Sequence, residues 1–199
     1  MNSNINDFSW FTQCLNNDTL CKKLSDVKMV ICDVDGTLTN GTIDYTDEHE
    51  YSRAFSILDG FAIVSAQKSG LLVGLLSGKA HGSITIRAKK LGIPDNLCAE
   101  GKEEKIVTIR EMAALYNIPL SQILLIGDDF FDIKVKLADP TILFATLQDA
   151  PFYFHHFTDV VIPRNGGHHA VRLMLDLVLY LQKKHFAQTL IDQTLNERS

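Results

Sequence analysis

Short apolar runs recur along most of this chain, and polar or amphipathic stretches separate them. Five of the runs have the length of a buried strand, and they lie at residues 29–32, 71–76, 96–99, 122–126 and 141–145. Three of the intervening stretches fit helices, at residues 80–91, 103–116 and 130–137. Buried strands that alternate with helices predict a parallel sheet covered by helices on both faces. We therefore expect a doubly wound, Rossmann-like α/β fold.

The segment after the first strand predicts a small flap and no separate cap domain. Residues 42–45 and 51–55 read as two strands around a polar turn at 46–49. We therefore expect a β-hairpin within residues 41–58, which is too short a stretch to form a covering domain.

The two ends of the chain are more polar than its middle. An apolar stripe along the first residues predicts a leading helix, and its members are Phe8, Phe11, Leu15 and Leu20. We expect a helical extension over residues 1–27, a single domain over 28–182 and a polar tail over 183–199.

Composition and charge exclude several kinds of partner. The 199 residues carry a net charge of −5, which argues against binding nucleic acid. The four cysteines form no Cys-x-x-Cys pair, and the first 25 residues do not resemble a signal peptide. The apolar stretch at 173–181 is much shorter than the ~20 residues of a membrane span, so its face is expected to contact the core or another subunit. We expect reduced thiols and a cytoplasmic protein with no membrane contact.

Polar side chains follow three of the expected strands. Asp33 and Asp35 come after the first strand, Ser77-Gly78-Lys79 after the second, and Gly127-Asp128-Asp129 after residues 122–126. Lys105 lies in the first turn of an expected helix. Because ligands of such sheets bind beyond the carboxyl ends of the strands, we expect these residues to meet at one edge.

The residue types at this edge suit phosphoryl transfer. Asp33, Asp35 and Asp128 offer the hard oxygen ligands that Mg²⁺ prefers. One carboxylate could attack phosphorus, and a second could carry the proton. Ser77, Gly78 and Lys105 could hold the phosphate oxygens. Taken singly, Ser77 could instead cap a helix, and Lys105 could be a solvated surface lysine.

Four motifs in this order resemble those of the haloacid dehalogenase superfamily of phosphohydrolases. They are Asp33-Val34-Asp35-Gly36-Thr37, Ser77, Lys105 and Gly127-Asp128-Asp129-Phe130-Phe131-Asp132. The resemblance implies that Asp33 is the nucleophile and a metal ligand. It implies that Asp35 is the acid/base, with a backbone carbonyl on Mg²⁺, and that Asp128 is the remaining ligand. Asp132 would support these ligands, and Asp129 is the alternative ligand.

From about residue 28 to residue 181 the chain is similar to one branch, the 3-deoxy-D-manno-octulosonate 8-phosphate phosphatases. The shared stretches are Phe55-Ser56-Ile57-Leu58-Asp59-Gly60, Leu91-Gly92-Ile93, Gly127 to Asp132, and Gly166-Gly167 with Ala170-Val171-Arg172. The resemblance implies a homotetramer and a small phosphorylated sugar acid as substrate. It implies substrate contacts from Asp35, Leu58, Asp59, Gly60, Gly78, Lys79, Arg87 and Lys105.

Several positions depart from the pattern of that branch. Leu58 and Val64 replace basic residues, and Lys79 replaces an arginine, whereas Arg87 matches. Arginine binds a carboxylate at two points and lysine does not. These exchanges therefore predict fewer contacts with the carboxylate of a sugar acid. The eight-carbon substrate is the first hypothesis, with a nine-carbon nonulosonate 9-phosphate or a broader specificity as the alternative.

Other interpretations stay open at this point. Asp59 is as plausible a cap for a helix over 59–69 as it is a substrate contact. Phosphoryl transfer to an acceptor other than water is the rival reaction, and a catalytically idle binding or assembly module is the rival class. His155-His156 and His168-His169 are adjacent pairs, and we interpret them as solvated histidines of loops or helix starts, with no metal.

Overall fold

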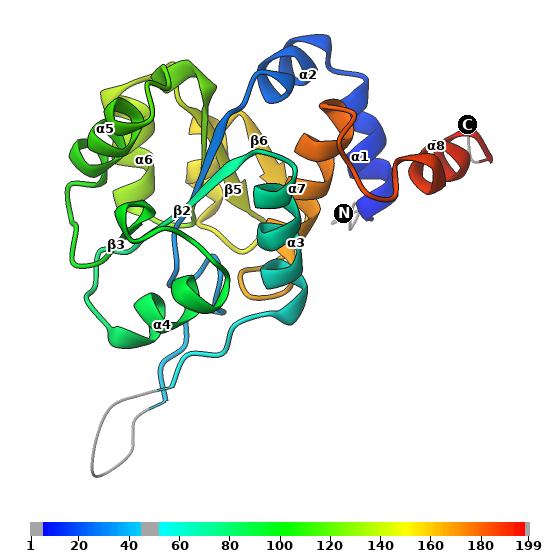
Figure 1. The fold of residues 1–199 in the computed structure, drawn as a ribbon. Helices are drawn as coiled ribbons and strands as arrows, with labels where there is room; N and C mark the ends of the chain where they lie inside the picture. Colours follow the sequence, from blue (N-terminus) through cyan, green and yellow to red (C-terminus); the bar gives the residue numbers. More distant parts are fainter. Residues whose placement is uncertain (1–5, 45–51, 198–199) are drawn as a thin grey trace.

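The computed structural model describes residues 6–44 and 52–197. These residues form a central parallel sheet with the strand order β3-β2-β1-β4-β5-β6 (Figure 1). The strands are β1 (Met29–Cys32), β2 (Leu72–Leu76), β3 (Cys98–Ala99), β4 (Ile123–Ile126), β5 (Leu143–Leu147) and β6 (Val160–Ile162). The first five correspond to the five predicted strands.

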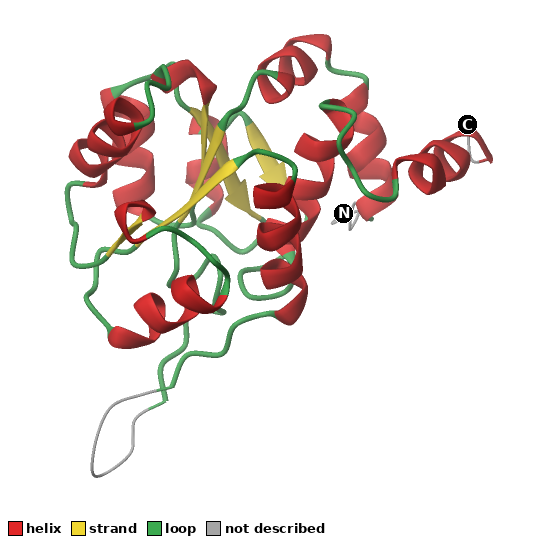
Figure 2. Cartoon of the chain, viewed as in Figure 1, coloured by secondary structure: helices red, strands yellow, loops and turns green. Residues whose placement is uncertain are grey.

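Helices cover both faces of this sheet, as Figure 2 shows. They are α1 (Asp7–Leu15), α2 (Asp18–Ser25), α3 (Ile57–Lys68), α4 (Gly82–Lys90), α5 (Lys105–Leu115), α6 (Phe130–Ala138), α7 (Ala170–Leu181) and α8 (Gln188–Glu197). Short 3₁₀ turns lie at η1 (Asp95–Leu97), η2 (Leu120–Gln122) and η3 (Phe152–Phe157). Helix α3 packs on α7 and α5 packs on α6, in two separate layers. The predicted doubly wound α/β fold is confirmed.

Strand β1 lies at the centre of the sheet and positions the candidate site. All four of its residues are fully buried, and burying an aliphatic side chain contributes about 1.5–3 kcal/mol. Its last residue, Cys32, is in register with Leu75 of β2 and Ile126 of β4. The chain therefore leaves β1, β2 and β4 at the same edge of the sheet, as the sequence predicted.

The N-terminal stretch that was predicted as one helix folds as two. Asn17 separates them, because its side chain accepts a hydrogen bond from the amide of Leu20 and caps α2. Both helices contribute to the main core through Trp10, Phe11 and Leu24. The Trp10 indole also donates to the carbonyl of Val161 at 2.7 Å, which ties α1 to the edge strand β6.

The prediction that Asp59 caps its own helix was wrong. Ser56 caps α3, and its hydroxyl accepts the amide of Asp59 at 3.1 Å. The Asp59 carboxylate instead accepts the amide of Arg172, in the first turn of α7, at 2.7 Å. Asp59 thus joins two helices that are distant in sequence.

Other parts of the sheet also differ from the prediction. Strand β5 begins at Leu143, after Asp139 binds the amide and hydroxyl of Thr141 in a local turn. Strand β6 was not predicted, since its three residues are too few for a clear period-two pattern.

The predicted hairpin lies only partly within the described residues. Residues 42–44 and 52–55 form no strand there, although the Ser52 hydroxyl donates to Asp44 at 3.3 Å. The turn predicted at 46–49 lies outside the described residues. None of the helices in 6–44 and 52–197 combines the length and the apolar character that crossing a bilayer requires.

Candidate active site

A cavity of about 310 Å³ opens at the carboxyl edge of the sheet. Its walls come from the loops after β1, β2 and β4 and from the start of α5. They are formed by Asp33, Asp35, Ser77, Gly78, Lys79, Glu103, Lys105, Asp129, Phe131 and Asp132. The sequence-predicted groups therefore meet in one place, although not every predicted residue lines the cavity.

Lys105 is the central cation of this site. It is the first residue of α5, is only 4% exposed, and its Nζ donates to Asp33 at 2.5 Å and to Asp132 at 2.6 Å. Burial alone lowers the pKa of Lys105, but the charges of Asp33 and Asp132 outweigh it, so the pKa is raised. The lysine is thus charged and held in place, unlike a solvated surface lysine.

Three carboxylates surround this lysine. Oxygens of Asp33, Asp128 and Asp132 lie within 4.8 Å of one another. Burial, with Asp132 nearby, raises the pKa of Asp128 to about 7, and the same two causes raise the pKa of Asp33. Because one lysine cannot neutralise three acids, the raised pKa values favour proton retention in the cluster, and a divalent cation would take the place of these protons. Its all-oxygen donor set fits Mg²⁺.

Two of the three carboxylates in this cluster are among the predicted metal ligands. Asp33 and Asp128 are brought together as expected, and Asp132 joins them as a third member. The Asp35 side chain lies outside this cluster of three, and its predicted contribution was the backbone carbonyl. Asp129 is exposed and caps α6 through the amide of Phe130 at 2.6 Å. The Thr37 hydroxyl donates to Asp128 at 3.0 Å and orients it.

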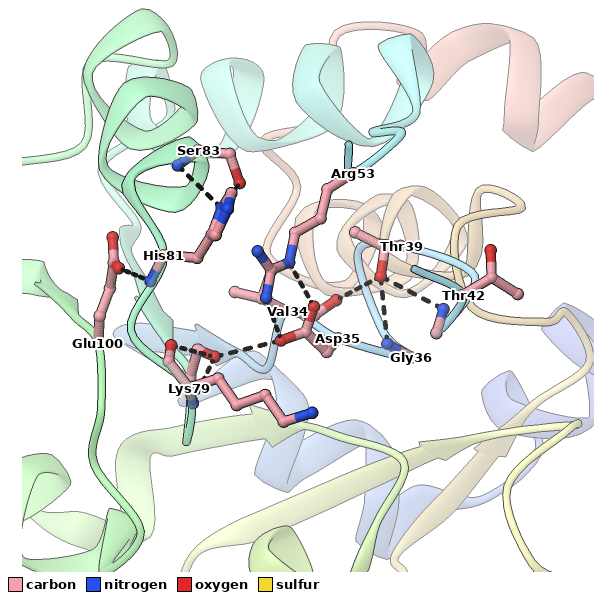
Figure 3. Close-up of polar contacts among 12 residues, drawn as sticks. Val34, Asp35, Gly36, Thr39, Thr42, Arg53, Lys79, His81, Ser83 and Glu100 are labelled. Atoms are coloured by element: carbon pink, nitrogen blue, oxygen red, sulfur yellow. Dashed lines mark hydrogen bonds and ion pairs between the residues drawn. The ribbon is translucent and has the colours of Figure 1, made fainter. Parts of the chain in front are cut away.

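Asp35 has a different environment from Asp33, and Figure 3 shows it. The guanidinium of Arg53 grips both Asp35 oxygens, from Nε at 2.6 Å and from Nη2 at 3.0 Å. The Ser77 hydroxyl approaches the same carboxylate at 3.4 Å and donates to the carbonyl of Lys79 at 3.0 Å. Ser77 does not cap α4, since His81 occupies that position.

Arg53 is a site residue that sequence reasoning missed. It lies within the second expected strand of the hairpin, at residues 51–55, and matches none of the four motifs. The available signal was a lone cation between two short apolar or neutral stretches, close to Phe55. That signal alone could not assign a partner 18 positions away in sequence.

The predicted substrate contacts divide into two groups. Gly78 and Lys79 line the cavity beside Lys105. Leu58, Asp59, Gly60 and Arg87 do not line it, and Leu58 is 45% exposed.

Arg87 is engaged elsewhere in this structure. Its guanidinium donates to the carbonyl of Ser56 at 2.9 Å and lies over the ring of Phe55. A Cβ atom on Gly60 would lie 2.4 Å from the Arg87 Nη2, so the glycine makes this approach possible. Burial lowers the pKa of Arg87. Its role as a substrate contact stays a prediction.

A glycine loop before α7 packs against the loop that follows β1. A Cβ on Gly166 would lie 1.8 Å from the carbonyl oxygen of Gly36, so only glycine permits this contact. Gly36 has a φ of +92°, and its own Cβ would lie 2.1 Å from Asp128. The loop also presents His169, whose Nδ1 hydrogen-bonds the Ser56 hydroxyl at 2.8 Å. His168 is exposed, whereas His169 is partly buried.

Comparison with known proteins gives a consistent picture. No protein-family model matches the chain. The chain is 33% identical over 163 residues to the 3-deoxy-D-manno-octulosonate 8-phosphate phosphatase KdsC of Haemophilus influenzae, a match that covers 82% of this chain and 88% of that protein.

Two solved structures are similar over most of their length. The cobalt-bound deoxy-D-mannose-octulosonate 8-phosphate phosphatase of Haemophilus influenzae is 30% identical with a TM-score of 0.77, over 89% of this chain and 99% of that one. The Moraxella catarrhalis 3-deoxy-D-manno-octulosonate 8-phosphate phosphatase, in complex with magnesium, phosphate and KDO, is 26% identical with a TM-score of 0.78, over 89% and 98%.

Proposed function

This chain belongs to the family of 3-deoxy-D-manno-octulosonate 8-phosphate phosphatases, within the haloacid dehalogenase superfamily, and we propose that it hydrolyses 3-deoxy-D-manno-octulosonate 8-phosphate through an aspartyl-phosphate on Asp33. The observation that carries the proposal is the buried Lys105, which bridges Asp33 and Asp132 beside Asp128. Burying three acids and one lysine at a cavity is costly for stability and is typical of a functional site.

The proposed reaction has two steps. In the first, an Asp33 oxygen attacks phosphorus and the bond to the sugar oxygen breaks, with its electron pair passing to that oxygen. Asp35 gives its proton to the leaving oxygen. In the second, water attacks phosphorus, Asp35 takes the proton of the water, and Asp33 leaves as a carboxylate. Inorganic phosphate and the free sugar acid are the products.

Other side chains stabilise the transferring group. Lys105 places a positive charge where the phosphate oxygens gather negative charge, at the start of α5. The Ser77 hydroxyl and the Gly78 amide lie at the same wall of the cavity and can donate to those oxygens. Phosphoryl transfer depends mainly on such positioning and charge, so these contacts supply much of the rate.

We propose Mg²⁺ as the metal, held by Asp33, Asp128 and the backbone carbonyl of Asp35, with Asp132 behind them. The excess of carboxylate oxygens over cations supports a hard divalent ion. When bound, the ion supplies positive charge that draws the phosphate oxygens toward the carboxylates. A relative is described with magnesium and another with cobalt, so a series of divalent ions belongs in the test.

A broader substrate range is the second candidate. It is favoured by Leu58, which is exposed and uncharged, and by Arg87, which is engaged with Ser56. A nine-carbon nonulosonate 9-phosphate is the natural comparison, because it carries the same carboxylate and phosphate on a longer chain.

We propose that the protein works as a homotetramer in the cytoplasm, with residues 28–182 as its phosphatase domain. The exposure of Ile57 (83%) and Phe61 (48%) on α3 supports an assembled form. The cysteines at 14, 21, 32 and 98 are free, which supports a reducing compartment. Analytical ultracentrifugation of the purified chain tests the assembly, and a monomer would overturn it.

The reaction is tested by phosphate release from a panel of phosphate esters. The panel includes 3-deoxy-D-manno-octulosonate 8-phosphate and a nine-carbon nonulosonate 9-phosphate. We expect activity that needs a divalent ion, disappears with a chelator, and falls by at least about a thousandfold in Asp33→Asn. Full activity in Asp33→Asn would remove the proposed nucleophile. Absence of turnover on every ester, in a folded protein, would instead favour a binding module.

The acceptor is tested in the same assay by adding short alcohols. Hydrolysis yields one inorganic phosphate for each ester consumed. A new alkyl phosphate in place of inorganic phosphate would identify a phosphotransferase.

A further inference from the structure

The Arg53–Asp35 pair has no place in the two chemical steps described above. We propose that Arg53 is the specificity residue that binds the carboxylate of the substrate, and that Asp35 occupies its guanidinium until that carboxylate arrives. This inference rests on the proposed function, since it concerns the acid group of the sugar-acid ester.

The geometry of the pair is that of carboxylate recognition. Nε and Nη2 of Arg53 donate to the two different oxygens of Asp35, at 2.6 and 3.0 Å. Such two-point contacts select for a planar carboxylate and are stronger than neutral hydrogen bonds. The Arg53 side chain is fully buried, whereas the Asp35 side chain is 26% exposed. The guanidinium is thus fixed in place and meets its acid at the solvent-accessible edge of the cavity.

The other arginines of the described residues are committed elsewhere or remote. Arg87 donates to Ser56, Arg164 pairs with Asp7, and Arg172 pairs with Asp176. Arg110 is exposed on α5. Of the arginines in residues 6–44 and 52–197, Arg53 is therefore the one whose guanidinium contacts a residue that lines the active-site cavity.

The nearby lysines do not offer the same recognition. Lys105 is taken up by Asp33 and Asp132, and Lys79 presents a single ammonium group without a planar fork. Leu58 is apolar. A carboxylate entering this cavity therefore finds its two-point partner only at Arg53 among the described cations that line or contact the cavity.

The exchange is physically balanced. A substrate carboxylate that replaces Asp35 on Arg53 substitutes one ion pair for another, so the buried guanidinium is never left unpaired. Asp35 is then released toward the scissile bond, beside Ser77. An ester without a carboxylate lacks the group that makes this exchange, and it has to bind while Asp35 stays on Arg53.

The test compares two esters on three variants of the intact protein. The esters are 3-deoxy-D-manno-octulosonate 8-phosphate and p-nitrophenyl phosphate, which has no carboxylate. The variants are Arg53→Gln, Arg53→Lys and, as a control, Arg110→Gln, which removes an exposed arginine outside the site. Circular dichroism confirms that each variant is folded.

In Arg53→Gln we expect the ratio of kcat/KM for the sugar-acid ester to kcat/KM for p-nitrophenyl phosphate to fall about tenfold or more, mainly through KM for the acid. Arg53→Lys recovers part of the ratio, because it keeps the charge and loses the fork. Arg110→Gln leaves both esters unchanged. The free sugar acid inhibits the wild type and inhibits Arg53→Gln more weakly.

Two outcomes separate this inference from the function beneath it. An equal loss on both esters in Arg53→Gln overturns the inference, because Arg53 would then serve the phosphate or the fold. Failure of the wild type to hydrolyse either ester overturns the proposed function itself. A drop in kcat alone, with KM for the acid unchanged, also rejects a carboxylate contact.

Discussion

Asp33 and Asp35 stand two positions apart and have different partners. Asp33 is 5% exposed and bound to Lys105, whereas Asp35 is paired with Arg53 at the edge of the cavity. A nucleophile needs a fixed position near the phosphate, and a proton carrier needs access to both the leaving oxygen and water. The environments of these two aspartates fit those two roles.

Asp128 is expected to make metal binding dependent on pH. Its pKa in the folded chain is raised to about 7, whereas an unfolded aspartate titrates near about 3.9. Between these values the folded state holds a proton that the unfolded state has lost, so the contribution of Asp128 to the free energy of unfolding of the metal-free protein falls as pH rises. Mg²⁺ has to displace this proton at low pH and meets a free carboxylate at high pH.

We therefore expect Mg²⁺ to raise the melting temperature more at pH 8 than at pH 6. Thermal scans with a chelator or with Mg²⁺ at the two pH values measure the difference. Asp128→Asn is the control, in which most of the difference should vanish. An equal rise at both pH values would contradict the link between Asp128 and the metal.

Helices α3 and α7 are coupled at the scale of secondary structure. Asp59 sits in the first turn of α3 and accepts the amide of Arg172 in the first turn of α7. The glycine loop that precedes α7 packs on Gly36, next to Asp128. The position of α7 is thereby linked to the loop that carries Asp33 and Asp35.

Replacing Asp59 should loosen this connection. Asp59→Ala removes a helix cap, and we expect a loss of about 1–2 kcal/mol in the free energy of unfolding. Asp59→Asn keeps an oxygen acceptor and should lose less. Urea denaturation followed by circular dichroism gives both values. Equal losses in the two variants would mean that the charge of Asp59, and not its hydrogen bond, is what stabilises the fold.

At the scale of the whole molecule, the N-terminal helices are joined to β6, the edge strand of the sheet. Trp10 is the one tryptophan of the chain, is 4% exposed and donates to Val161 on β6. Helices α1 and α2 belong to the same apolar core as the strands. Domains with one core usually unfold in a single cooperative transition.

Tryptophan fluorescence therefore reports on the cohesion of the entire fold. We expect the fluorescence and far-UV circular dichroism midpoints to coincide in urea. Trp10→Phe removes the hydrogen bond and keeps an aromatic ring, which should cost about 1 kcal/mol in urea denaturation followed by circular dichroism, since this variant has no tryptophan. A fluorescence midpoint well below the circular dichroism midpoint would show that α1 detaches before the sheet unfolds.

The fold could be predicted largely from local pattern. Apolar runs such as 29–32 and 122–126 became strands at those places, because burial in a parallel sheet requires continuous apolar residues. The helix start at Ser56 was harder to predict, since Ser56 and Asp59 are both good caps and only packing against α7 assigns their roles.

The residues proposed for the reaction were predicted from the sequence, because order and spacing put Asp33 and Asp128 after two neighbouring strands and Lys105 in the first turn of a helix at the same edge of the sheet. Only the tertiary structure decided which acid pairs with which cation. The contacts of Arg53 with Asp35, of Asp59 with Arg172 and of Gly166 with Gly36 join positions far apart along the chain. Such pairings depend on how helices and loops pack on the sheet. The periodicity of apolar residues, which is two in a strand and 3.6 in a helix, does not predict them.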